Sequence, residues 1–417
     1  MKEYELHFNY KDIFLAPRLA LSPKKIWVLI IGNLSGFIIY WITSYLSLIL
    51  SGVEINVAVA DYGLYPFLFG SSSPLISWII YYFGILSWLS FILASCSGVS
   101  RITLKELQGD NFYSANDAID FVIKKWKSVL FAPLSIFLII LLFILMAYIF
   151  ALFGSIPIIG SMTFPILYLF YFFGSIFTIF SFFALFCSIL FSSSIIGAYE
   201  EDTIGTVFHS YQITFGQPWR AILYNILLFL LAIIFANVLS WFYTNSFYLI
   251  NQIFGFFMGA KLENIVGYAS SIVDISWISD NMSEITINIE DNLFALPNAA
   301  SDLIELILSL FNNLFSQFLI ALPNFSFEIY TDSLTALETV AGMLLSLPLI
   351  LLLLSVLSYS IAILSVGETI IFVIFKKIMD NENILSVNDE VLTDSSTNEM
   401  NDLDKSSHNI LSSFEEE

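Results

Sequence analysis

The sequence predicts an all-α membrane protein with about six transmembrane helices, arranged as three hairpins. Of its 417 residues, 58% are hydrophobic and only 12% are charged, whereas a soluble protein carries about a quarter charged residues. The apolar residues gather in long segments, and the Lys and Arg residues lie beside the ends of these segments. Together these observations favour a polytopic protein with a fixed orientation in the bilayer.

Six apolar segments are long enough to cross a bilayer, which takes about 20 residues in a helix. The fourth and sixth segments are longer than this, which predicts that they tilt or extend beyond the membrane. In chain order the predicted spans are 26–50, 75–96, 129–153, 163–197, 219–243 and 336–375.

The basic residues predict how the spans are oriented. All but Lys261 lie in four regions: Lys2 to Lys25, Arg101 to Lys127, Arg220, and Lys376 to Lys405. Because cytoplasmic loops carry an excess of Lys and Arg, we expect both termini to be cytoplasmic. This asymmetry is typical of a multi-pass protein of the bacterial inner (plasma) membrane.

The segments around the spans complete the predicted organisation. We expect an amphipathic cytoplasmic N-terminus, five spans that include interfacial helices, a mostly helical extracytoplasmic insertion, the sixth span, and a disordered acidic tail. The acidic insertion is interpreted as a docking cap, a lid or a passive loop. In the same order these regions are 1–25, 26–243, 244–335, 336–377 and 378–417.

Two amphipathic stretches predict interfacial helices on the cytoplasmic side, at 114–128 and 202–217. In the first, apolar residues recur at helical spacing, and Ser114 with Asp117 has the pattern of a helix cap. In the second, Asp202 or Thr203 is the expected cap, and Gly216 and Pro218 end the helix.

Small residues in the spans predict close helix contacts. Gly98, just after the second span, and Gly197, at the end of the fourth, each follow a small residue four positions earlier, a spacing that lets membrane helices approach closely. Asn33 lies inside a Gly-x-x-x-Gly pattern, which favours a role in packing over a role in ligand binding.

The sequence contains no motif for a catalytic, cofactor-binding or metal site, and no basic aromatic surface suited to nucleic acid. Glu368 is the charged residue that lies away from the ends of a predicted span, so it either couples to an ion or forms hydrogen bonds near the interface. The remaining candidates are polar residues in the spans or interfacial residues beside them: Asn33, Asn225, Asn237, Glu201, Asp202, Trp219 and Arg220.

Two parts of the chain resemble a known group of proteins. One is the run 16–27, APRLALSPKKIW; the other joins Glu200-Glu201-Asp202 to Phe208-His209-Ser210-Tyr211 and Pro218-Trp219-Arg220. They resemble an uncharacterised family of bacterial six-span membrane proteins, a similarity that implies six spans but no activity. The layout is also distantly similar to the membrane domain of some glycerophosphodiester phosphodiesterases, whose catalytic barrel the sequence lacks.

The leading hypothesis is a non-enzymatic integral membrane protein, a scaffold or accessory factor that organises lipids or partner membrane proteins. Basic residues would form a cytoplasmic rim for anionic lipid headgroups: Arg18, Lys24, Lys25, Lys124, Lys125, Lys127 and Arg220. The alternative is a transporter or permease for a small or lipidic solute, with a polar cavity lined by Asn33, Asn225 and Asn237. A membrane-embedded enzyme would need several titratable groups in the spans, where only Glu368 qualifies.

Overall fold

The computed structural model describes residues 6–68, 73–274, 309, 313, 316–317, 321–327 and 334–386, and in these ranges it contains helices and no strand. The all-α fold class is therefore confirmed. The elements are η1 (Tyr10–Leu15), α1 (Ala16–Ala20), α2 (Pro23–Leu50), α3 (Ile55–Tyr62), α4 (Leu75–Gln108), α5 (Ala115–Gly154), α6 (Ile159–Tyr199), α7 (Thr203–Gly216), α8 (Pro218–Met258), α9 (Ala260–Val273), α12 (Ala336–Met379) and η2 (Ile384–Ser386).

Within the described ranges, six helices are long and apolar enough to cross a membrane: α2, α4, α5, α6, α8 and α12. Each contains one of the six predicted spans, as expected for a multi-pass membrane protein. Two boundaries differ from those the sequence analysis placed. Residues 115–128 do not form a separate interfacial helix but continue into α5, and residues 244–258 continue α8 instead of opening the insertion.

The long helices pair as three hairpins, α2 with α4, α5 with α6, and α8 with α12. The returning helices α4, α6 and α12 also contact one another. Their closest packing involves residues 94–107, 187–198 and 356–376, which are almost all buried. We call this region, together with α1 and the first turns of α2 and α8, the hub, because one continuous hydrophobic core runs through it.

Glycine and serine bring the returning helices close together in the hub, as the small-residue spacing predicts. A Cβ atom added to Gly197 would lie 2.6 Å from the Cβ atom of Ser100. The Ser193 hydroxyl donates a hydrogen bond of 3.0 Å to the carbonyl of Leu93, and the Ser365 hydroxyl donates one of 2.9 Å to the carbonyl of Cys96. The helices therefore meet through backbone as well as side chains.

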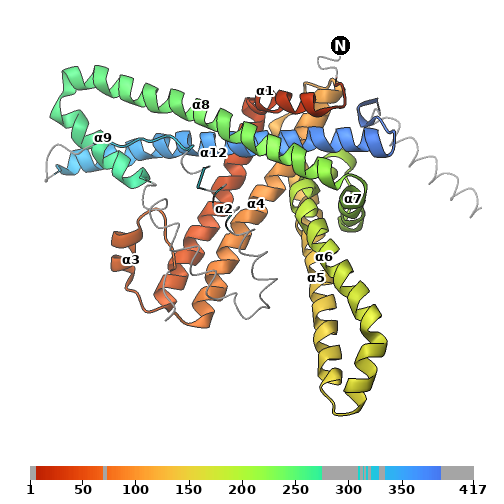
Figure 1. Cartoon of the computed structure of the whole chain (residues 1–417). Coiled ribbons are helices and arrows are strands. Elements are labelled where there is room, and N and C mark those ends of the chain that lie inside the picture. Colours follow the sequence, from red (N-terminus) through yellow and green to blue (C-terminus); the bar gives the residue numbers. More distant parts are fainter. Residues whose placement is uncertain are drawn as a thin grey trace, which may run out of the picture.

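The hairpins diverge as they leave the hub. Figure 1 shows α2–α4 and α5–α6 running downwards and apart, whereas α8, α9 and α12 extend across the picture. Each hairpin has its own apolar cluster away from the hub, such as the one in which Phe247 of α8 and Leu262 of α9 pack with Leu349 of α12. The sequence analysis predicts the three hairpins but not this divergence.

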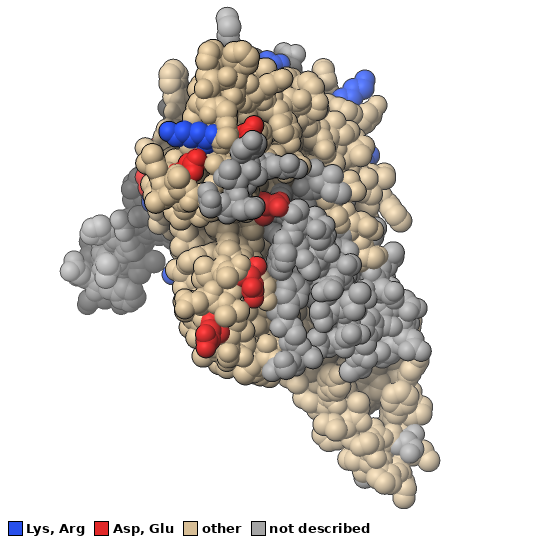
Figure 2. Space-filling model, turned by 90° about the vertical axis from the view of Figure 1, so that its left-hand side faces the viewer, with Lys and Arg blue, Asp and Glu red and all other residues tan. Residues whose placement is uncertain are grey.

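Figure 2 shows a face on which most of the described atoms belong neither to acidic nor to basic residues. The α5–α6 hairpin contributes to this apolar character, since residues 128–199 include no charged side chain. Such a surface fits contact with lipid chains. Residues 275–308 of the predicted insertion lie outside the described residues, as does the tail from residue 387 onward.

Candidate functional site

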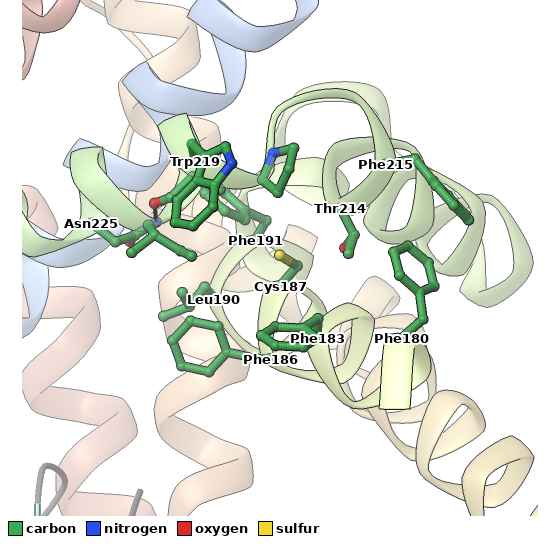
Figure 3. A pocket seen from close by; sticks show the side chains of 13 residues that line it. Phe180, Phe183, Phe186, Cys187, Leu190, Phe191, Thr214, Phe215, Trp219 and Asn225 are labelled. Carbon is green, nitrogen blue, oxygen red and sulfur yellow. Dashed lines mark hydrogen bonds between the residues drawn. The ribbon is translucent and has the colours of Figure 1, made fainter. Parts of the chain in front are cut away.

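The candidate site is a pocket of about 380 Å³ between α6, α7 and α8. This volume falls in the range of about 300–1,000 Å³ that is usual for ligand pockets. Figure 3 shows its lining, with Asn225 and Trp219 at one end, Phe180 and Phe215 at the other, and Cys187 between them. The complete lining is Phe180, Phe183, Phe186, Cys187, Leu190, Phe191, Thr214, Phe215, Pro218, Trp219, Ala221, Ile222 and Asn225.

Helix α7 forms one wall of the pocket because its ends and its apolar face are both fixed. The Asp202 carboxylate caps its start by accepting a hydrogen bond of 2.8 Å from the Gly205 amide. On the face toward α6, the Tyr211 hydroxyl donates to the Ser181 hydroxyl at 3.0 Å. The rings of Phe215 and Phe180 lie 4.0 Å apart between centroids. These contacts hold α7 along α6.

The pocket has a buried floor and an exposed aromatic rim. The floor consists of side chains that are less than a tenth exposed: Cys187, Phe191, Thr214, Ala221 and Asn225. On the rim, the exposed fractions are 76% for Trp219, 69% for Phe215 and 53% for Phe186. Because Trp219 and Phe186 extend from the membrane-type helices α8 and α6, an apolar molecule in the surrounding bilayer would meet the pocket directly.

The polar groups of the floor are few and largely fixed. The Asn225 Nδ2 donates a hydrogen bond of 2.9 Å to the carbonyl of Ala221. The Asn225 Oδ1 is buried and has no hydrogen-bond partner. The Thr214 hydroxyl donates to the carbonyl of Ser210 at 2.7 Å. Among the described residues that line the pocket, none carries a charge, so the site suits a mainly apolar, uncharged group.

Two of the residues singled out from the sequence, Asn225 and Trp219, come together in this pocket. Arg220 follows Trp219 but does not line the cavity. Its side chain is exposed, and its Nη1 donates to the Gln217 Oε1 at 3.0 Å. It is therefore available to polar groups outside the pocket.

The structure does not gather the other candidates around this pocket. Asn33 in α2 accepts a hydrogen bond of 3.2 Å from the indole nitrogen of Trp88 in α4. Asn237 is exposed on α8, and its Nδ2 donates to the carbonyl of Ile233. Glu368 is 8% exposed in the hub part of α12. The three asparagines therefore each have a different environment and do not share this cavity.

Glu201 and Asp202 lie at the start of α7, at the hub end of the molecule. Asp202 caps the helix, as the sequence predicts. Glu201 lies 3.7 Å from the Nε2 atom of His209. The His209 ring stacks on Tyr199, with 5.5 Å between centroids. These residues hold α7 against the end of α6.

The basic residues expected to form a rim divide into structural and exposed groups. Lys25 is fully buried, with its Nζ atom 2.6 Å from the Glu106 carboxylate and 2.9 Å from the carbonyl of Leu19. It therefore joins α2 to α4 and is not available to lipid headgroups. Arg18, Lys124, Lys127 and Arg220 are exposed at or near the hub end.

The sequence analysis did not single out the α6 side of the pocket. Phe180, Phe183, Cys187, Leu190 and Phe191 recur at helical spacing along one face. That spacing could have marked them, but α6 is apolar on all sides, so it does not distinguish this face from the others.

Comparisons with protein-family models, with curated proteins and with solved structures give no match for this chain. The expected similarity to the membrane domain of glycerophosphodiester phosphodiesterases is thus unsupported. The geometry of the pocket and the surface around it are therefore the features from which a function can be inferred.

Proposed function

We propose that this chain is a non-enzymatic integral membrane protein that binds and organises lipids, with the pocket between α6, α7 and α8 as its lipid site. The observation that carries the proposal is the uncharged, aromatic-rimmed cavity. Its volume suits one lipid chain or part of one. Its exposed rings would lie among lipid tails, where an acyl chain can enter without crossing water.

The charged surface beside the pocket supports the same proposal. Arg220 is exposed next to the rim residue Trp219, and a guanidinium at the end of an apolar helix can reach headgroups while its stem stays in the interface. We propose that the hub end faces the cytoplasm of a bacterial inner membrane, with both chain termini on that side. Exposed basic residues near the hub would then meet anionic headgroups.

The proposal is tested by changing the mouth of the pocket and leaving the rest of α8 unchanged. Ile222 lines the pocket, whereas Ile226, one turn later, does not. Both are exposed, with fractions of 38% and 60%. Ile222→Trp would fill part of the cavity, and Ile226→Trp adds the same bulk to the same helix outside it.

The measurement is native mass spectrometry of the full chain after gentle extraction and delipidation. We expect a retained lipid on the wild type and on Ile226→Trp, and its loss on Ile222→Trp. The proposal fails if the delipidated wild type retains no lipid, or if Ile222→Trp retains as much lipid as Ile226→Trp. A stoichiometric protein in place of a lipid would support the scaffold role without the lipid site.

A further inference from the structure

The inference starts from a buried, unpaired acceptor on Asn225, one of the described residues that line the pocket. Asn225 is 3% exposed, and its Oδ1 has no partner. The amide orientation is set by the bond from Nδ2 to the carbonyl of Ala221, four residues earlier on α8. A buried acceptor without a partner costs about 1–3 kcal/mol, so a ligand that supplies a donor would recover free energy on binding.

The unpaired oxygen differs from most other unpaired polar atoms in the described residues. Many of those are serine hydroxyls, which can rotate and donate to a carbonyl of their own helix. Asn33 and Asn251 each leave a nitrogen unpaired, which can do the same. An amide oxygen cannot, because the helix N–H groups already bond to backbone carbonyls. Only a donor from outside α8 can pair with it.

The rest of the lining defines the chemistry of that donor. Thr214 uses its hydroxyl proton on the Ser210 carbonyl, so its oxygen offers the pocket a second acceptor. In the part of the chain that the structure describes, the lining contains no acidic residue to compensate an ammonium group and no basic residue to compensate a carboxylate. The matching group is therefore a neutral hydroxyl or amide N–H.

The position of Asn225 defines how the ligand lies. Figure 3 shows Asn225 at one end of the pocket and the rings of Phe180 and Phe215 at the other. A ligand with its donor at Asn225 would run past Cys187 toward these rings, with apolar surface along its whole length. One flexible hydrocarbon chain has this shape.

Building on the proposed function, we propose that the pocket selects a membrane lipid that joins an apolar chain to a neutral hydrogen-bond donor, and that the Asn225 Oδ1 is the specificity-determining acceptor. Lipids with a hydroxyl or amide N–H next to the chain belong to this class. Lipids that carry only ester or ether oxygens at this position do not belong to it, because these oxygens accept hydrogen bonds and so cannot pair with the Asn225 Oδ1, which is also an acceptor.

The test is a competition between oleyl alcohol and oleyl methyl ether for the full chain in detergent, read by native mass spectrometry. The two probes share the same chain; the ether carries a methyl group in place of the hydroxyl hydrogen, so it lacks the donor and is heavier by one CH2. We expect the wild type to prefer the alcohol by about fivefold or more, because the alcohol alone pairs with the buried acceptor.

Two asparagine variants locate the preference. Asn225→Leu keeps the size of the side chain and removes the acceptor, so we expect it to bind both probes about equally. Asn237→Leu is the matched control, since Asn237 lies on the same helix and makes the same bond to the carbonyl four residues earlier, but is exposed and outside the pocket. It should keep the wild-type preference.

The possible outcomes separate this inference from the proposed function. If neither probe binds the wild type, the lipid site itself is wrong. If both probes bind the wild type equally, the pocket binds lipid but does not select a donor, and the inference is wrong. A preference that persists in Asn225→Leu would remove Asn225 from the recognition. The wild-type competition decides the donor question even if the variant does not fold.

Discussion

The close approach of α6 to α4 gives a sharp test of the hub. Gly197 and Gly174 both lie inside α6, but their surroundings differ. A Cβ added to Gly197 would lie 2.6 Å from the Ser100 Cβ and 3.0 Å from the Arg101 backbone nitrogen. A Cβ added to Gly174 meets nothing within 4 Å. Exchanging each glycine for alanine therefore adds the same methyl group to the same helix, once in contact and once in open space.

The expected difference in the free energy of unfolding between the two variants has two contributions. In a helix, alanine is favoured over glycine by about 0.5–1 kcal/mol, and this gain applies to both variants. Optimal carbon–carbon contact is about 3.5–4.0 Å, so Gly197→Ala forces α6 and α4 apart by about 1 Å. Overpacking of this kind costs about 1–3 kcal/mol. The first term cancels between the variants, so Gly197→Ala should be about 1–3 kcal/mol less stable than Gly174→Ala.

The assay is denaturant unfolding of both variants and the wild type in the same detergent, followed by circular dichroism. We expect Gly174→Ala to be at least as stable as the wild type and Gly197→Ala to be the least stable. The separation should also lengthen the bond that the Arg101 Nη1 donates to the Gly197 carbonyl, which is 3.3 Å in the wild type. Equal stability of the two alanine variants would refute the packing of α6 on α4 described above.

Three further predictions use the same unfolding measurement. Lys25→Met should destabilise the protein by about 3 kcal/mol because it leaves Glu106 without its buried partner; adding Glu106→Gln should restore part of this loss, and no recovery would argue against the pair. Asp202→Ala should cost about 1 kcal/mol by removing the cap of α7, and Asp202→Ser should cost less; equal losses would show that capping is not its role. Asn225→Leu should leave the ligand-free protein as stable or more stable, because it removes an unpaired acceptor; a loss above about 1 kcal/mol would contradict this.

The number of long helices and several of their caps could be predicted from the sequence because these depend on local features. Apolar length predicts the spans. Ser114 and Asp117 form the expected capping box, in which each residue accepts from the backbone of the other. Asp202 caps α7 as expected. Each of these outcomes depends on residues that are close to one another in the sequence, so the order of the residues is enough to predict it.

The length of α8 could not be predicted in this way. The expected span ends at Tyr243 because polar residues follow it, but the helix continues to Met258. Asn245 explains the continuation, because its Nδ2 donates to the carbonyl of Trp241. Its side chain thus has a hydrogen-bond partner within the helix. The helix ends where Gly259 adopts a φ of 54°, a conformation that glycine adopts readily. Polarity therefore does not predict where the helix ends, whereas the backbone conformation at Gly259 explains it.

The pocket could not be predicted because it depends on how three helices meet. Cys187, Thr214 and Asn225 come from α6, α7 and α8. In the sequence, Cys187 reads as one apolar residue among many, and Asn225 resembles Asn237. Asn225 differs from Asn237 because it is buried and its Oδ1 has no hydrogen-bond donor. This environment follows from the placement of α6 and α7 around it. Local spacing contains no information of that kind when the helices are apolar on every side.

A difference between the second and third hairpins explains why the pocket lies where it does. Both begin with an amphipathic segment that leads to a proline, Pro133 in α5 and Pro218 in α8. Proline disfavours helical geometry in the residue before it. In α5 the helix nevertheless continues through Ala132, which is fully buried.

Before Pro218 the helix breaks, because Gln217 adopts φ −142° and ψ 47° and follows Gly216. The break lets α7 fold back along α6 instead of extending into α8. The small side chains of Thr214 and Ala221, on either side of the break, then line the pocket together with Cys187 of α6. The pocket is thus a consequence of one interrupted helix, and the Gly-Gln-Pro sequence is its local cause.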